Sequence, residues 1–293
     1  IGYEYEKKGP YEEPQIIIIE RGENIAGKLT DSGFIDNPMV FNISGRITGQ
    51  ATQLKAGEYE IPPRASIKML LNQLEEGKTV ERRFTVREGL TSFETVNIIK
   101  AVENLSGDIH PAPAEGALWP DTLDYHKHED HNAVLSRLKT AMEALLIALC
   151  QRPPALNFAA LQDEPCTGAP TPLETVKDVL TLASIVEKET AVPEERERVA
   201  GVFLNRLKRG IPLQTDPTVI YALTKGKHKN DGKGPLGRRL LSKDLQVDNP
   251  YNTYKYAGLP PGPIANPGRA SLEAVLNPET HDYIYFVADG SGG

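Results

Sequence analysis

Residues 182–196, LASIVEKETAVPEER, mark the end of one helical pattern and the start of a second. Upstream, apolar residues recur at helical spacing from Leu173 onward. Downstream, Pro193 is a favoured first helical residue, and Glu194 and Glu195 complement the dipole of the first turn. We therefore predict one helix that begins near Leu173 and a second that runs from Pro193 to Gly210. The apolar stripe of the first consists of Val176, Val179, Leu180, Ala183 and Val186.

Two of the glutamates in the quoted stretch, Glu187 and Glu189, lie near the end of the first predicted helix. Successive residues 100° apart place them at opposite edges of the apolar stripe, with Lys188 pointing away from it. Partial desolvation at such an edge raises the pKa of a carboxyl group and keeps it protonated, as a general acid requires. Most glutamates at a helix edge are instead solvated or ion-paired. Periodicity alone does not decide whether Glu187 or Glu189 is the candidate acid.

The composition describes an ordinary globular chain and excludes some classes of function. With 33 basic and 40 acidic residues, the net charge of −7 argues against a dedicated nucleic-acid-binding protein. No stretch approaches the run of about 20 apolar residues that a membrane span requires. Neither GxGxxG nor GxxxxGK[ST] occurs in the strand–helix units of the first hundred residues, so no phosphate-binding loop is predicted there.

The cysteines and histidines give weak signals. Cys150 and Cys166 permit one disulfide, but an unpaired or purely structural role is slightly favoured. His126, His128 and His131 lie in the acidic loop DYHKHEDH without an accompanying thiolate pair or HExxH helix. We interpret them as surface histidines, and we predict neither a metal site nor a cofactor.

Three regions follow one another along the chain. Residues 1–103 read as strand–helix units, among them a helix from Ile67 with Ser66 as its N-cap and Gly77 as its stop. Residues 104–172 are rich in Pro and Gly, and we predict a connecting region with one helix near Val134–Leu149. Residues 173–293 hold the two helices described above, followed by three loop blocks. These are LQTDPTVIYAL (213–223), DNPYNTYKYAGLPPGPIANPG (248–268) and YIYFVADGSGG (283–293), of which the last begins like an apolar strand.

The combination of ASIVEKET, VAGVFLNRL, LQTDPTVIY, YNTYKYAGLPPGPIANPG and YFVADGSGG resembles the YceG-like family of endolytic murein transglycosylases. The resemblance is specific over residues 173–293 and looser over residues 1–103, which resemble the LysM-like domain of the same family. EGALWPDTLDY, which contains Pro120, Asp121 and Thr122, is also similar to a family stretch. The family resemblance implies an α+β fold, with a small LysM-like module followed by a mixed α/β catalytic domain of the lytic-transglycosylase kind.

The resemblance also selects one of the two glutamates. The family's catalytic glutamate is directly followed by Thr, which here implies Glu189 with Thr190 after it. The loop blocks 213–223 and 248–268 supply aromatic rings, amides and hydroxyls, which are the groups that a sugar-binding cleft needs. The substrate-binding residues implied by the resemblance are Gln214, Thr215, Asp216, Tyr251, Asn252, Thr253 and Tyr254.

A lytic transglycosylase needs only one acid/base residue, whereas most glycosidases use two carboxylates. The resemblance implies that Glu189 protonates the glycosidic oxygen between N-acetylmuramic acid and N-acetylglucosamine. The same residue then accepts the proton of the muramoyl 6-hydroxyl, which closes on C1 and leaves a 1,6-anhydro end. Asp216 is the best alternative second carboxylate, although Asp-Pro at a turn is more often structural.

The implied partners are peptidoglycan glycan strands and the cell-wall synthesis machinery. The implied location is the inner membrane, through a single N-terminal span that this sequence does not include, with the catalytic region in the periplasm. Members also continue into a terminal helix with His and Asn, which this sequence lacks as well. The alternative is a non-catalytic peptidoglycan-binding scaffold protein, against which the intact Glu189-Thr190 and YNTY argue. A pyridoxal-phosphate lyase would need a Schiff-base Lys and a phosphate-binding cup, and neither is evident.

Overall fold

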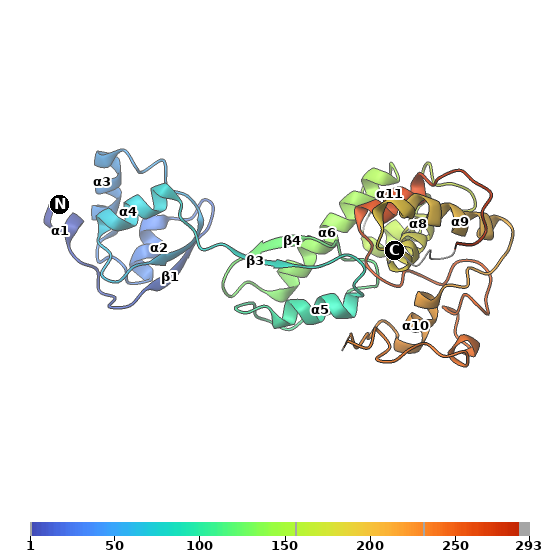
Figure 1. Ribbon diagram of the computed structural model, residues 1–293. Coiled ribbons are helices and arrows are strands. Elements are labelled where there is room, and N and C mark those ends of the chain that lie inside the picture. The colour runs from blue at the N-terminus through green and yellow to red at the C-terminus, as the bar shows by residue number, and fades with distance from the viewer. Residues whose placement is uncertain (1, 156, 231, 287–293) are drawn as a thin grey trace. The chain divides into compact units, whose positions relative to one another are not determined.

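The structure is a computed structural model that describes residues 2–155, 157–230 and 232–286. Its mixture of helices and strands makes it an α+β protein, as predicted (Figure 1). The chain forms two compact units. Unit 1 comprises Ile1–Arg83 and Asp124–His128, and unit 2 comprises Phe84–Leu123 and Glu129–Gly293.

Unit 1 is built on an antiparallel pair of strands, β1 (Gln15–Ile19) and β2 (Gly57–Ile61). The register runs from Gln15 opposite Ile61 to Ile19 opposite Gly57, and Tyr59 between them is fully buried. Helices close the core around the inner face of this sheet. They are α1 (Gly2–Glu6), α2 (Ile25–Asp31), α3 (Pro38–Thr48) and α4 (Ile67–Glu76).

Local sequence signals in unit 1 explain why helix α4 was predicted and why helix α3 was not. Helix α4 was predicted correctly: the Ser66 hydroxyl accepts a hydrogen bond from a backbone N–H of the first turn, and Gly77 ends the helix at φ 73°. Helix α3 was not predicted, although Asn37 caps it. Two of the three residues that it buries have small or polar side chains, so no apolar stripe marked it in the sequence. They are Phe41, Ser44 and Gly45.

Strands β3 (Arg82–Thr85) and β4 (Thr122–Tyr125) pair with each other, and the boundary between the units runs through both. The other described elements of unit 2 are the helices α5 (Ser92–Ala101), α6 (His131–Leu149), α7 (Phe158–Gln162), α8 (Val176–Glu189), α9 (Arg196–Lys208), α10 (Asp216–Thr224) and α11 (Arg269–Leu276) and the short 3₁₀ helices η1 (Pro193–Glu195) and η2 (Asp244–Gln246).

This division differs from the predicted boundaries after residues 103 and 172. Helix α5 belongs to unit 2, because its Ile99 is buried in a core with Val86, Leu118 and Leu138 of α6. Long-range packing between segments 84–101 and 131–149 therefore places the division earlier than composition suggested. The predicted helix near Val134–Leu149 is confirmed as α6, which begins at His131 after the N-cap Asp130.

Two local predictions in the C-terminal half are wrong. The block LQTDPTVIYAL was read as a loop, but α10 covers Asp216–Thr224, with Pro217 in its first turn. The described part of the last block, residues 283–286, forms no strand. Its remaining residues, 287–293, lie outside the described residues and include most of YFVADGSGG.

Cys150 and Cys166 form a disulfide, which corrects the preference for unpaired cysteines. Cys150 follows α6, and Cys166 lies 16 residues later, in the segment that precedes α8. Both side chains are buried in the main core of unit 2. In a chain-entropy model, a cross-link that closes a loop of this length contributes about 3 kcal/mol to the stability of the folded state.

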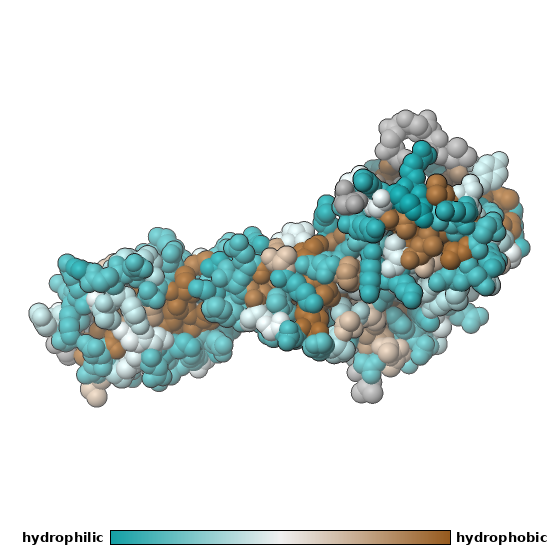
Figure 2. All heavy atoms as spheres, turned by 90° about the horizontal axis from the view of Figure 1, so that it is seen from below, coloured by the Kyte–Doolittle hydropathy of each residue, from teal (hydrophilic) through white to brown (hydrophobic). Residues whose placement is uncertain are grey.

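No helix formed by the described residues is both long and apolar enough to cross a membrane. Helix α6 has 19 residues but carries Arg137, Lys139 and Glu143, whereas a span needs about 20 predominantly apolar ones. The single-pass inner-membrane location implied by the resemblance is therefore not supported, and we do not retain it. On the face of the molecule in Figure 2, hydrophobic residues reach the surface among hydrophilic ones, which is usual for globular proteins.

Candidate active site

Helix α8 carries both glutamates of the quoted stretch, at its C-terminal end. Its first turn is held by a capping box, in which the Thr175 hydroxyl accepts from the Asp178 N–H and the Asp178 carboxylate accepts from the Thr175 N–H. Every residue from Val179 to Val186 is buried, because α8 packs against α7, α9, α10 and α11. The helix is therefore a rigid support for the side chains at its end.

Glu187 is part of the packing between α8 and α11. One of its oxygens, Oε2, accepts hydrogen bonds from the Gly268 N–H at 3.0 Å and from the Ser271 hydroxyl at 2.6 Å. The other oxygen, Oε1, lies 3.7 Å from a guanidinium nitrogen of Arg196. The Glu187 side chain is only 6% exposed, so little of its carboxylate is open to solvent. Glu187 is a structural residue in this arrangement.

Glu189 lies two residues later, in different surroundings. Its Oε1 accepts a hydrogen bond from the Thr215 hydroxyl at 2.7 Å. Burial raises the pKa of the Glu189 carboxyl above its usual value, the hydrogen bond from Thr215 opposes that rise, and the negative charge of Asp216 adds to it. A half-buried carboxyl of this kind holds its proton closer to neutral pH than a solvated glutamate does.

The segment that faces Glu189 is the start of α10. Asp216 is its first residue and Thr215 its N-cap, and Gln214 before them has a left-handed backbone with φ 51°. That conformation lets the Gln214 N–H donate to the Thr253 carbonyl oxygen at 3.1 Å. The Thr215 N–H donates to the Thr253 hydroxyl at 3.2 Å. Two segments almost 40 residues apart in sequence are thus fixed side by side next to Glu189.

The second of these segments is the turn at residues 251–254. Asn252 is fully buried, and its amide nitrogen donates to the carbonyl oxygens of Leu245 at 2.9 Å and Val247 at 2.8 Å. Its side-chain oxygen accepts the Tyr254 N–H at 3.0 Å, which holds Tyr254 in place. The Tyr254 hydroxyl donates to Asp216 Oδ1 at 2.7 Å. Burial, followed by the carboxylate of Asp216, raises the pKa of Tyr254.

The structure thus brings most of the predicted site residues together, in different roles. Thr215, Asp216 and Tyr254 surround Glu189 through direct contact or charge. The exposed Gln214 accepts a hydrogen bond from Arg206 of α9 at 2.6 Å. The side chains of Asn252 and Thr253 are buried and hold the backbone of the site, so they do not present themselves to a substrate.

Tyr251 lies in a neighbouring cluster. Its ring centroid is 4.8 Å from that of Tyr221 of α10, whose hydroxyl donates to Glu115 at 3.2 Å. Burial raises the pKa of Glu115, and the hydrogen bond from the Ser92 N–H opposes that rise. No hydrogen bond in the described residues connects Tyr251 to Glu189.

Sequence reasoning missed two supporting residues within its own motifs. Thr218 lies in LQTDPTVIY, and its hydroxyl is 2.8 Å from both the Thr215 carbonyl oxygen and the Thr253 hydroxyl. Arg206 lies in VAGVFLNRL, and it donates to Gln214 and to the Pro212 carbonyl oxygen. Reading the first block as a helix would have placed Thr218 one turn after Thr215 and revealed its role.

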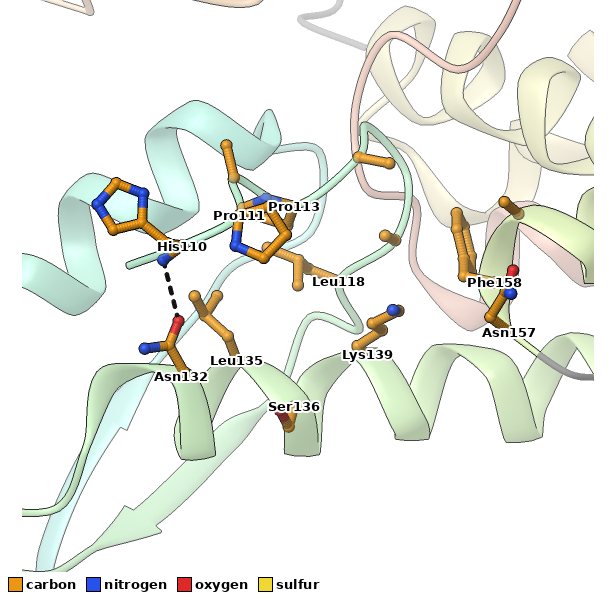
Figure 3. A pocket seen from close by; sticks show the side chains of 14 residues that line it. His110, Pro111, Pro113, Leu118, Asn132, Leu135, Ser136, Lys139, Asn157 and Phe158 are labelled. Carbon is orange, nitrogen blue, oxygen red and sulfur yellow. Dashed lines mark hydrogen bonds between the residues drawn. The ribbon is translucent and has the colours of Figure 1, made fainter. Parts of the chain in front are cut away.

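A pocket of about 330 Å³ lies elsewhere in unit 2 (Figure 3). It is lined by the segment from His110 to Leu118, by one face of α6, which includes Leu135 and Lys139, and by Phe158. None of the predicted site residues lines it. Its lining is mostly apolar and contains no pair of facing carboxylates, so it offers no alternative centre for acid–base cleavage.

Comparisons with known proteins identify the family of the chain. The model of the YceG-like family matches residues 17–293. The chain is 52% identical to an endolytic murein transglycosylase of Bacillus subtilis (strain 168) over 118 residues, which are 40% of this chain and 30% of that protein. It is 28% identical over 318 residues to one of Streptococcus pneumoniae (strain ATCC BAA-255 / R6), covering 92% of this chain and 53% of that protein. A solved structure of a YceG-like protein from Listeria monocytogenes has a TM-score of 0.54 and 30% identity, with 96% of this chain and 95% of that chain covered.

The chain therefore belongs to the YceG-like family. It spans about half the length, or less, of the curated relatives that it matches. The resemblance read from the motifs is confirmed at the level of the family.

Proposed function

We propose that the protein is an endolytic peptidoglycan lytic transglycosylase, with Glu189 as its single general acid and base. It cleaves the β-1,4 bond between N-acetylmuramic acid and N-acetylglucosamine within a glycan strand, and it leaves 1,6-anhydro ends. The observation that carries the proposal is the environment of Glu189: a half-buried carboxyl, with one hydroxyl donor and a raised pKa, at the end of a rigid helix. The names of its relatives support the reaction class.

The two proton transfers of the reaction use opposite charge states of Glu189. In the first, the protonated carboxyl gives its proton to the glycosidic oxygen while the bond to C1 breaks. In the second, the carboxylate takes the proton of the muramoyl 6-hydroxyl as that oxygen bonds to C1, so Glu189 returns to its starting state. A carboxyl whose pKa lies above its usual value suits the first step, because it keeps its transferable proton to higher pH than a solvated glutamate does. Thr215 supports the second state, since its hydroxyl donates to the ionised oxygen.

We assign Asp216 an electrostatic role in this reaction. Its charge raises the pKa of Glu189, and its Oδ1 is occupied by the Tyr254 hydroxyl. A closure by the substrate's own 6-hydroxyl consumes no water, so it requires no carboxylate to activate one. Asp216 and Tyr254 are then available to position the sugar next to Glu189.

We also propose that unit 1 is a LysM-like module that holds peptidoglycan, and that cell-wall synthesis enzymes are partners of the protein. The first part is supported by the separate hydrophobic core of unit 1, which is what an independent binding module needs. The second part rests on the family resemblance.

The products of a digestion test the proposal. Purified glycan strands incubated with the protein are analysed by mass spectrometry. Internal cuts with 1,6-anhydromuramoyl ends are expected, each lighter by one water than a hydrolytic reducing end. Reducing ends would instead identify a hydrolase and make Asp216 the second carboxylate. Binding without any cleavage would identify the scaffold protein of the alternative interpretation.

A further inference from the structure

The segment that joins α10 to the 251–254 turn has a charge opposite to that of the whole protein. Residues 225–243, here called the basic segment, contain seven Lys or Arg and one Asp, whereas the chain carries −7. Such separation of charge on a globular protein creates a local positive field that attracts anionic ligands. The basic residues are Lys225, Lys227, Lys229, Lys233, Arg238, Arg239 and Lys243.

Most of the residues that carry this charge have no ion pair that the described part of the chain shows. Arg238 is paired, since its guanidinium donates two hydrogen bonds to Asp244 at 2.6 and 2.9 Å. By contrast, Lys225, Lys229 and Arg239 are exposed, and none of them has an ion-pair partner among the described residues. Lys227 lies 6.0 Å from the ring centroid of Phe93, and no carboxylate of the described residues forms an ion pair with it.

Both ends of the basic segment are attached to the candidate active site. Lys225 is the C-cap of α10, the helix that begins at Asp216. At the other end, the carbonyl oxygens of Leu245 and Val247 accept the side-chain hydrogen bonds of Asn252, which holds Tyr254. In Figure 1 these segments surround α10. A helix of nine residues places Lys225 roughly 13 Å from Asp216.

The start of the segment is also fixed from within unit 2. The Gly226 carbonyl oxygen accepts a hydrogen bond from the Thr91 hydroxyl at 2.6 Å. The buried His228 ring lies 3.6 Å from Glu94, and Asn230 donates to the same carboxylate. The side chains of Lys227 and Lys229, on either side of His228, therefore extend from a fixed backbone and place their charges in a defined region.

We propose that the basic segment binds the carboxylates of the peptides carried by a glycan strand whose sugar backbone lies at Glu189. This inference rests on the proposed function and names the form of its substrate: strands that still bear peptides. Four extended peptide residues span roughly 13–14 Å, which matches the length of α10 between Asp216 and Lys225. Carboxylates at that distance meet uncompensated cations, and the attraction adds to the binding of the sugars.

The test uses a triple variant and a matched control. Lys225→Gln, Lys229→Gln and Arg239→Gln together remove three charges of the basic segment. Lys100→Gln, Lys139→Gln and Lys208→Gln remove three exposed charges elsewhere in unit 2, none of which has an ion pair among the described residues. Each triple is made in the active protein and also in Glu189→Gln, so that binding is measured without cleavage.

The substrates are peptide-bearing strands and the same strands stripped of peptides by an amidase. We expect the segment triple to weaken co-sedimentation with peptide-bearing strands and to raise KM roughly tenfold, since exposed ion pairs are individually weak and three of them are removed together. Binding of stripped strands and kcat should not change, and the control triple should behave as the wild type. The difference between the triples should vanish at about 1 M salt, where the Debye length is roughly 3 Å.

Three results would overturn the proposal. An equal loss on both kinds of strand would mean that the segment does not read the peptides. An equal loss in the control triple would mean that only the net charge matters. A loss of binding to anionic phospholipid vesicles with unchanged strand binding would assign the segment to a lipid surface. Absence of all cleavage by the wild type would contradict the proposed function. The co-sedimentation measurements would still test whether the basic segment binds the peptides.

Discussion

The two faces at the end of α8 carry the same side chain and use it in opposite ways. On the α11 face, Glu187 accepts from a backbone N–H and a hydroxyl and lies near the guanidinium of Arg196. On the α10 face, Glu189 receives one hydroxyl donor and faces another carboxylate. The difference teaches that the donors and charges around a carboxylate, more than its position on the helix, decide whether it stabilises the fold or carries a mobile proton.

The largest expected effect separates the two faces directly. Glu189→Gln keeps the shape of the side chain and an oxygen that accepts from Thr215, but it removes the transferable proton. We expect cleavage of glycan strands to fall by about 10² to 10⁴-fold or more, because general acid–base catalysis contributes that much and the neighbouring Asp216 carboxylate is occupied by the Tyr254 hydroxyl. Thermal stability should stay the same or rise slightly, since a desolvated charge is lost. Substantial remaining cleavage would mean that the catalytic acid lies elsewhere.

The matched substitution on the α11 face, Glu187→Gln, should lower stability and retain cleavage. Glu187→Gln removes one of the two carboxylates near Arg196, whose buried Nε already has no hydrogen-bond partner among the described residues, and leaves only Glu88. The free energy of unfolding of unit 2 should fall by about 1–3 kcal/mol. Urea unfolding followed by the fluorescence of Trp119, the only tryptophan of the chain, reports this unit. Cleavage per folded molecule should be retained, and a loss as deep as that of Glu189→Gln would remove the distinction between the faces.

A smaller effect is expected from the charge that faces Glu189. Asp216→Asn removes the negative charge that raises the pKa of Glu189, so that pKa should fall. A general acid is active below its pKa, and the alkaline limb of the kcat/KM profile should therefore move to lower pH. Cleavage rates across a pH series measure this shift. An unchanged limb would mean that Asp216 does not influence the proton of Glu189.

A shift of the opposite sign is expected when the hydroxyl that donates to Glu189 is removed. Thr215→Val removes the hydrogen bond that stabilises the ionised form of Glu189, so its pKa should rise further and the alkaline limb should move to higher pH. The backbone contacts of Thr215 with Thr253 do not involve this hydroxyl, so the fold should be retained. Shifts in the same direction for Thr215→Val and Asp216→Asn would show that general loosening of the site causes both.

Short-range signals in the sequence predicted a good part of the fold. Caps and apolar periodicity identified α4, α6 and α8, because those interactions join residues three or four positions apart. The same signals failed for α3, whose buried face is small and polar, and for α10, where Asp-Pro was taken for a turn. The disulfide and the position of the division between the units depend on contacts between distant segments, which no local pattern encodes.

For the site, the sequence by itself determined the ingredients: two glutamates at the end of a buried helix and two blocks of polar and aromatic residues. Family resemblance selected Glu189, but the physical reason for the choice lies in the tertiary structure. Only folding brings the Thr215 hydroxyl to Glu189 across 26 positions and the Ser271 hydroxyl to Glu187 across 84. Because desolvation and hydrogen bonding act over a few ångströms in space, the pKa of each carboxyl is decided by partners that periodicity along one helix does not contain.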